Sequence, residues 1–278
     1  DRNVEALDDI VRKQGIRANI TGQLSPQAAL SAKLGYHQVR ARLPQNDNND
    51  LSPIANSVLG SAFDNPDTRG YIFYPPALYS QIGVDQAVDR VTASLYGTWR
   101  PLGWLSLTGL GGVDYAGRSD QSVLPPALIP GPDERTLGQR QSNPYGLWTY
   151  TGNASATATW RPVASIEANS SLGTQFNREI VHGTQAFGQG LAAGTGSLGG
   201  TTSGFAVNEQ NQEIVTLGVF AQQRIAWRDK LFLTASLRGD DNSNFGQDLE
   251  FVTYPAASLS WVVNEESWFP RTNLVSSL

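Results

Sequence analysis

A glycine-rich segment is the first place where this sequence could do chemistry. Residues 194–199 read G-T-G-S-L-G and fit the G-x-G-x-x-G pattern of phosphate-binding turns. In a dinucleotide site that turn follows a strand and opens a helix, whose N-terminus meets the pyrophosphate. Here the chain continues as G-T-T-S-G, which is a poor start for a helix. We therefore interpret this segment as a flexible loop.

Oxygen-bearing side chains gather at residues 240–244, which read D-D-N-S-N and could ligate a hard cation. The spacing lacks the glycine and the terminal glutamate of an EF-hand loop. The overlapping residues Arg238, Gly239 and Asp240 spell an adhesion tripeptide, but their place where a strand is expected to end favours a turn. We interpret both as a solvated turn, and metal binding by the long loops stays open.

Acid–base and nucleophilic chemistry have few candidates. His37 and His182 are the two histidines among 278 residues, lie far apart and form no evident Ser/His/Asp set. The acidic pairs at 8–9 and 265–266 are better explained as solvated turns. Without cysteine there is no thiol nucleophile, thiolate metal site or disulfide. The sequence predicts no catalytic, cofactor-binding or metal-binding residue, and therefore no enzyme; substrate-binding residues stay unknown.

Alternation with a period of two residues is the clearest signal of structure. At residues 150–160 the even positions are Tyr, Gly, Ala, Ala, Ala and Trp, while the odd positions are Thr, Asn, Ser, Thr and Thr. Successive side chains of a strand point to opposite faces, so this segment has one apolar and one polar face. The same pattern recurs at 16–24, 91–99 and 231–237. We expect the apolar sets to face lipid and the polar sets to face a water-filled lumen.

Nine strands are predicted, and each is long enough for the ~9–11 residues with which a tilted strand crosses a bilayer. Their expected ranges are 16–24, 28–43, 90–100, 104–116, 149–160, 164–176, 213–227, 231–239 and 251–263.

The connections between these strands alternate in length. Short turns are expected at 25–27, 100–103, 161–163 and 228–230, and long loops at 44–89, 117–148, 177–212 and 240–250. Short turns at one rim and long loops at the other are typical of an outer-membrane barrel. Aromatic residues flank the short turns, as at a membrane–water boundary: Trp99, Trp104, Trp160, Trp227 and Phe232.

Composition and charge agree with this class. Charged residues make up 16% of the chain, against about 25% in a soluble domain. The net charge of −5 gives no reason to expect nucleic acid as a partner. No window approaches the ~18 apolar residues of a transmembrane helix. Residues 1–14 lack the basic start and apolar core of a signal peptide.

Two stretches resemble the barrel signature of SusC/RagA-type TonB-dependent receptors. In that family an R-D-x-S-x-F-G element precedes P-x-x-S-x-x-W and an acidic turn. Here residues 238–246 read R-G-D-D-N-S-N-F-G and residues 255–266 read P-A-A-S-L-S-W-V-V-N-E-E. Residues 42–49 (R-L-P-Q-N-D-N-N) and the turn 100–105 (R-P-L-G-W-L) are also similar to family segments. The likeness is spread over most of residues 16–270.

The resemblance implies a barrel of about 22 strands in the Gram-negative outer membrane. It also implies an N-terminal plug, a segment that engages the TonB complex and a SusD-like surface lipoprotein as partner. We therefore expect residues 1–278 to be part of the barrel domain, an all-β antiparallel up-and-down meander, with the plug and the C-terminal strands absent. No substrate-binding residue can be transferred from the family.

The leading functional hypothesis is TonB-dependent import of a nutrient such as an oligosaccharide or a peptide, with no cofactor. A passive porin-like or adhesin-like barrel is the alternative. A soluble glycan-binding β-sandwich is a third reading, which predicts two facing sheets and no lipid-facing band.

Overall fold

The computed structural model describes residues 10–45, 50–128, 134–192, 194–245 and 251–269. In these residues nine strands form one sheet, in the order β1 to β9, and every neighbouring pair is antiparallel. This confirms the predicted all-β meander. The strands are β1 Ile10–Ser25, β2 Ala28–Leu43, β3 Gly83–Leu102, β4 Leu105–Leu124, β5 Gln139–Val163, β6 Ile166–Leu191, β7 Thr201–Trp227, β8 Leu231–Asn242 and β9 Val252–Trp261.

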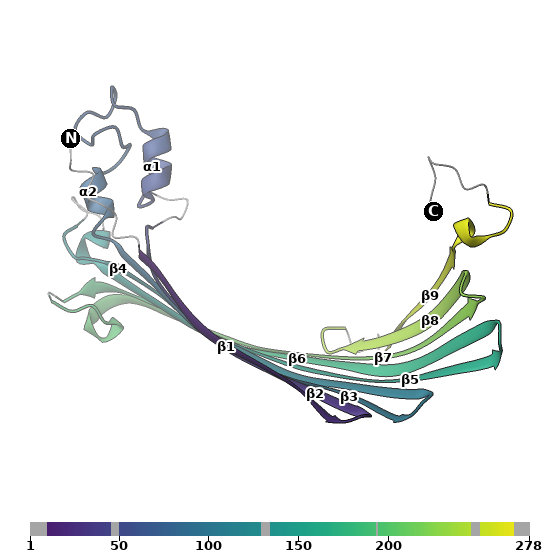
Figure 1. The fold of residues 1–278 in the computed structure, drawn as a ribbon. Helices are drawn as coiled ribbons and strands as arrows, with labels where there is room; N and C mark the ends of the chain where they lie inside the picture. Colours follow the sequence, from purple (N-terminus) through teal and green to yellow (C-terminus); the bar gives the residue numbers. More distant parts are fainter. Residues whose placement is uncertain (1–9, 46–49, 129–133, 193, 246–250, 270–278) are drawn as a thin grey trace.

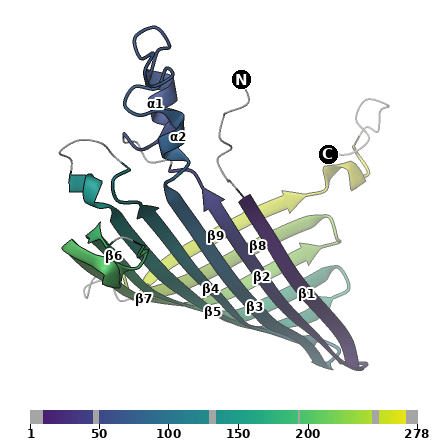
Figure 2. The same cartoon turned by 90° about the vertical axis from the view of Figure 1, so that its left-hand side faces the viewer.

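The sheet is open and bends into a twisted trough, with β1 at one edge and β9 at the other (Figures 1 and 2). A β-sandwich would have placed two sheets face to face. The single curved sheet therefore rules that reading out for the described part of the chain.

Most strands are longer than predicted, chiefly at the end where the long loops begin. β5 starts at Gln139 and not at residue 149, and β6 runs to Leu191 and not to residue 176. The reason is physical: backbone pairing continues where neither face meets lipid, so the alternation that marks a membrane segment fades while the ladder persists. By contrast, β2 has the predicted bounds.

The connection between β2 and β3 contains two short helices that the sequence did not predict, α1 Pro53–Leu59 and α2 Pro76–Tyr79. Each has proline in its first turn, where no intrahelical donor is lost. Ser52 caps α1, since its hydroxyl accepts from the Ala55 N–H at 3.4 Å. Neither helix has the length or the apolar character to cross a membrane.

A small apolar core holds this connection against the sheet. It contains Leu78, Tyr79, Ile82 and Leu124, so it joins α2 to the end of β4. The Tyr79 side chain is 2% exposed, and this burial raises the pKa of its phenol to about 12. The connection therefore has a fixed structure at the sheet.

Short and long connections fall at opposite ends of the strands, because each turn reverses an antiparallel meander. The short-turn end carries the turns after β1, β3, β5 and β7, and the long-loop end carries the connections after β2, β4, β6 and β8. The long connections are residues 44–82, 125–138, 192–200 and 243–251, shorter than predicted because the strands extend.

This topology predicts the result of thiol labelling in intact cells that express the full-length protein. The chain has no cysteine, so a single introduced thiol is unambiguous. Gly196→Cys, in the loop after β6, is expected to react with a membrane-impermeant maleimide, because long loops of outer-membrane barrels lie outside the cell. Leu102→Cys, at the short-turn end, is expected to react only after the cells are opened. The reverse pattern would overturn the topology.

Candidate functional site

The strand register joins the four apolar sets into one continuous face. Residues directly opposite one another in an antiparallel pair project to the same side of the sheet. One such row runs from Ile20 through Ala32, Leu95 and Gly111 to Gly152. We call this side the apolar face and the opposite side, with the interleaved Thr, Ser and Asn residues, the polar face.

A second row joins the remaining set to the same face. It runs from Ala156 through Leu172 and Ala221 to Leu237. Large apolar side chains stand exposed on this face, among them Ile20 at 68% and Leu172 at 64%. Exposed apolar side chains on many neighbouring strands suit lipid rather than water. The register therefore supports the expected lipid-facing surface.

Tryptophans mark the short-turn end of the apolar face. Trp99, Trp160, Trp227 and Trp261 belong to it by register and are about half exposed. Phe232 is a correction to the prediction. It lies on the polar face, where the Arg224 guanidinium carbon stands 4.9 Å from the ring centroid.

A second group of aromatic rings lies on the same face, nearer the long-loop end. We call it the upper aromatic group, and it includes Tyr115, Trp148 and Tyr150. The Tyr115 and Trp148 ring centroids are 4.3 Å apart, and Trp148 stacks on Tyr150 at 6.2 Å. Ten residues separate Tyr150 from Trp160 in β5. At ~3.3 Å per residue and a tilt of about 40°, that length covers about 25 Å, the height of the apolar band of such barrels.

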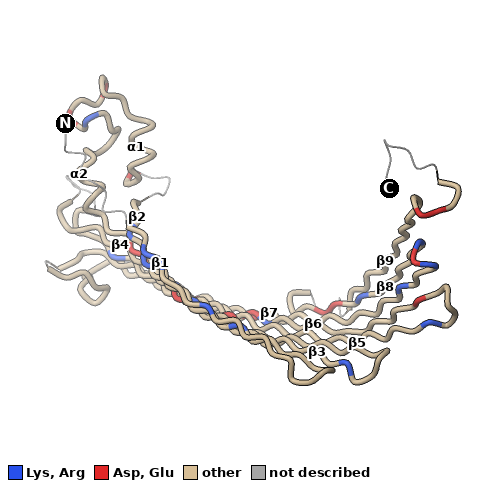
Figure 3. Tube along the Cα trace, in the orientation of Figure 1, with Lys and Arg blue, Asp and Glu red and all other residues tan. Residues whose placement is uncertain are grey.

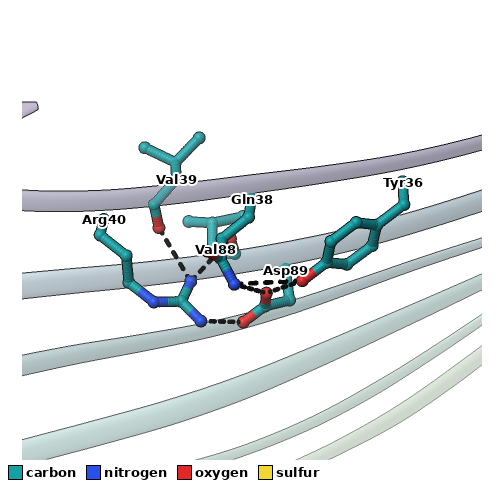
Figure 4. A network of polar contacts seen from close by, with 6 residues as sticks. All are labelled: Tyr36, Gln38, Val39, Arg40, Val88 and Asp89. Atoms are coloured by element: carbon teal, nitrogen blue, oxygen red, sulfur yellow. Dashed lines mark hydrogen bonds and ion pairs between the residues drawn. The ribbon is translucent and has the colours of Figure 1, made fainter. Parts of the chain in front are cut away.

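On the apolar face of the described strands, charged side chains appear only level with this upper aromatic group, as Arg178 opposite Tyr150, or beyond it. Asp89 accepts hydrogen bonds from the Tyr36 hydroxyl at 2.7 Å and from the Gln38 amide at 3.1 Å, and it pairs with Arg40 at 2.7 Å (Figure 4). Arg178 and Glu213 form a similar pair at 2.8 Å. These pairs mark the limit of the lipid band nearest the long-loop end, because charged side chains in hydrocarbon are strongly unfavourable.

The polar face carries hydrogen bonds that run from strand to strand. Side-chain oxygens pair between Thr108 and Ser155 at 2.6 Å, and between Thr157 and Ser171 at 2.9 Å. Arg90 donates to the Asp114 carboxylate across β3 and β4 at 2.9 Å. Figure 3 shows acidic and basic residues along the strands as well as in the turn after β7. This composition suits the lining of a water-filled lumen.

A hollow of about 460 Å³ lies on the polar face. Its lining comes from five strands and includes Arg17, Lys33, Thr92, Asp114 and Thr151. Among the described residues, neither Arg17 nor Lys33 forms an ion pair. The hollow therefore offers free positive charge to whatever fills the lumen at this level.

A second hollow of about 470 Å³ lies on the polar face nearer the long-loop end. Pairing between β5 and β6 is interrupted at Asn143 and Pro144, since proline has no N–H to donate to the ladder. The lining is rich in side-chain amides, including Asn143, Gln185, Asn208 and Gln210. The Asn143 Oδ1 atom is buried and accepts no hydrogen bond from the described residues. These amides can offer both donors and acceptors to a polar ligand.

The weak sequence candidates take structural roles. Residues 194–199 lie in the connection between β6 and β7, as predicted. Arg238 and Asp240 lie within β8 and not in a turn, because their backbones pair with both β7 and β9. Their side chains form an ion pair on the polar face at 2.7 Å. His182 belongs to β6 and not to a loop; its Nδ1 lies 2.8 Å from the Asn211 amide oxygen.

The remaining candidates give no chemistry either. The Glu266 carboxylate accepts from the Trp261 indole N–H at 3.3 Å, which fits the predicted acidic turn. No group of three or more possible metal ligands occurs within the described ranges. The acidic pair at 8–9 and residues 46–49 of the R-L-P-Q-N-D-N-N segment lie outside those ranges.

An antiparallel meander whose apolar face is bounded by two groups of aromatic rings is part of the wall of a transmembrane β-barrel. The family model described as "TonB dependent receptor-like, beta-barrel" matches residues 21–275. The chain therefore belongs to this family of non-enzymatic outer-membrane barrel proteins. None of the curated proteins matches the chain.

Solved structures of the family have the same fold. "Structure of the RagAB peptide transporter" matches with a TM-score of 0.78 at 14% identity, over 94% of this chain and 31% of that one. The ferric citrate transporter FecA in its unliganded form matches with a TM-score of 0.54 at 13% identity, over 90% and 33%. The chain thus spans about a third of the length of these structures.

Proposed function

We propose that this chain forms part of the barrel wall of an importer that takes up a nutrient, a peptide or an oligosaccharide, with energy supplied through TonB. The observation that carries the proposal is the match of residues 21–275 to the receptor barrel family. The sheet also resembles the RagAB peptide transporter more closely than FecA, with TM-scores of 0.78 and 0.54. That difference favours a polar organic nutrient over a ferric chelate.

The rest of the machinery comes from other parts of the full-length protein and from its partners. Within the described residues β1 and β9 each have one neighbouring strand, so further strands are needed to close a barrel. An N-terminal plug and a TonB-binding segment complete the proposed transporter. A SusD-like surface lipoprotein would meet the long-loop end, where the folded connection with α1 and α2 projects (Figure 1).

Uptake by whole cells tests the proposed function. Cells with the full-length gene are expected to accumulate labelled peptides or oligosaccharides of the kind present in the organism's natural medium. Cells with the gene deleted are not. Accumulation is expected to stop when TonB is deleted or the proton gradient is dissipated. Uptake that depends on the gene but continues without TonB would identify a passive pore and overturn the proposal.

A further inference from the structure

The upper half of β7 has a free edge. β6 pairs with β7 from Thr201 to Trp227, but β8 pairs only with the part from Thr216 to Trp227. Val215 exchanges hydrogen bonds with Ser243, just beyond the end of β8. The edge of residues 201–214 that would face β8 has no partner strand among the described residues. Such an edge presents a row of backbone N–H and C=O groups that can pair with another chain.

This edge lacks most of the features that protect exposed strands. Residues 201–215 contain no lysine, arginine or proline, although these residues commonly block edge pairing. A register shift near Gly204, whose φ is +63°, distorts the upper end. Below it, one of the two acidic residues, Glu213, is paired with Arg178. Residues 205–212 are exposed and thus form an open, extended edge.

The edge lies outside the lipid band, on the long-loop side. Fourteen residues separate Glu213 from Trp227 at the short-turn end, which exceeds the ~9–11 residues needed to cross the bilayer. Above Thr216, β7 runs past the end of β8 and stays paired with β6 alone. A molecule arriving from outside the cell would meet this edge before the lumen.

Side chains beside the edge differ between the two faces. Phe205 and Val207 are each 64% exposed on one face. Asn208 and Gln210 are on the other, where they line the 470 Å³ hollow beside Tyr145. An added strand would therefore place alternate side chains against apolar and amide groups.

We propose that the free edge of β7, residues 205–214, binds an extended peptide by strand addition. Backbone hydrogen bonds would hold the peptide, and the two rows of side chains would select among sequences. The proposal rests on the proposed import function and specifies peptide as its substrate class. Side chains of the bound peptide would then occupy the 470 Å³ hollow that is lined by side-chain amides.

Disulfide capture on the purified full-length protein tests the proposal. The probe is a library of heptapeptides with randomised flanks and a central cysteine activated as a mixed disulfide. Asn208→Cys, at the free edge, is expected to capture peptide about tenfold more than Gln141→Cys, an exposed site in β5 with strands on both sides. Equal capture at both sites would overturn the proposal. Disulfide-linked dimers formed without peptide would assign the edge to a second copy of the protein instead.

Methylation of the peptide backbone separates strand addition from side-chain contact. N-methyl groups placed in turn along a captured peptide are expected to reduce capture about tenfold at every second residue, because alternate N–H groups point to the partner strand. A uniform effect, or none, would contradict strand addition. If TonB-dependent peptide uptake is unchanged in the Asn208→Pro and Glu209→Pro variants, the edge site is refuted but the import function is not. If the unaltered protein takes up no peptide at all, the proposed peptide import itself is refuted.

Discussion

The 278-residue chain expressed alone is expected to give no steady single-channel conductance in a planar bilayer. Its nine described strands leave β1 and β9 each with an unpaired edge. In lipid no water can satisfy the N–H and C=O groups of those edges, so an open sheet is not a stable spanning structure. We expect irregular currents at most, and aggregates in detergent, because exposed ladders pair with other chains.

Direct closure of β1 on β9 is opposed by the shape of the sheet. Barrel diameter grows with strand number, so strands from a barrel of about 22 have a curvature suited to that wider circle. The apolar face would also have to bend far more sharply than the trough in Figure 1.

The control is the full-length protein purified in the same detergent. Denaturant is added to it at a concentration that displaces any plug but leaves the barrel folded. A monomeric complex of the short chain with stable, uniform conductance would contradict both the part-barrel proposal and the inferred barrel size. Conductance that requires the missing strands would support them.

The sequence predicted the parts of the fold that face lipid, because lipid imposes alternation on one face of each strand. Ala154, Ala156 and Ala158 alternate with Asn, Ser and Thr, and that part of β5 was found. Residues 139–143 of the same strand have polar residues on both faces, so their pairing leaves no such pattern. The sequence therefore indicated where each strand crosses the membrane, but not where each strand begins and ends.

The helices in the β2–β3 connection were missed although they leave a local signal. Ser52 before Pro53 is a typical helix start, with a capping hydroxyl followed by proline at the first helical position. The sequence predicts a connection of about 46 residues here. Connections of that length without helices or strands are uncommon, which is a further reason to expect helices. The apolar residues around Tyr79 could be recognised as a core only after β4 was known to extend to Leu124.

The candidate site depends on register, which a single sequence does not specify. Asn143 and Asn208 are 65 positions apart and meet only because β5, β6 and β7 pair as they do. The free edge of β7 exists because β8 ends at Asn242, fifteen residues below the start of its neighbour. Neither feature has a composition that distinguishes it from an ordinary polar loop.

Arginine at Ala154 is expected to prevent most of the full-length protein from reaching its folded state in the outer membrane. Ala154 lies on the apolar face between Tyr150 and Trp160, near the middle of the lipid band. Transfer of arginine to the bilayer midplane in such barrels is unfavourable by about 2–4 kcal/mol. That is a large fraction of the ~5–15 kcal/mol by which folded proteins are stable. Folding can be followed by heat-modifiable mobility on gels and by urea titration into lipid vesicles.

The neighbouring residue supplies the matched control. Asn153 is adjacent in β5 but projects to the polar face, opposite Leu110 and Gln175. Asn153→Arg therefore places the same side chain and charge at nearly the same depth, but in the water of the lumen, and is expected to fold within about 1 kcal/mol of the parent. Equal loss from both variants would show that bulk at this position, and not lipid, is responsible. Greater loss from Asn153→Arg would reverse the assignment of the two faces, because the alternation of β5 allows only one of these neighbours to meet lipid.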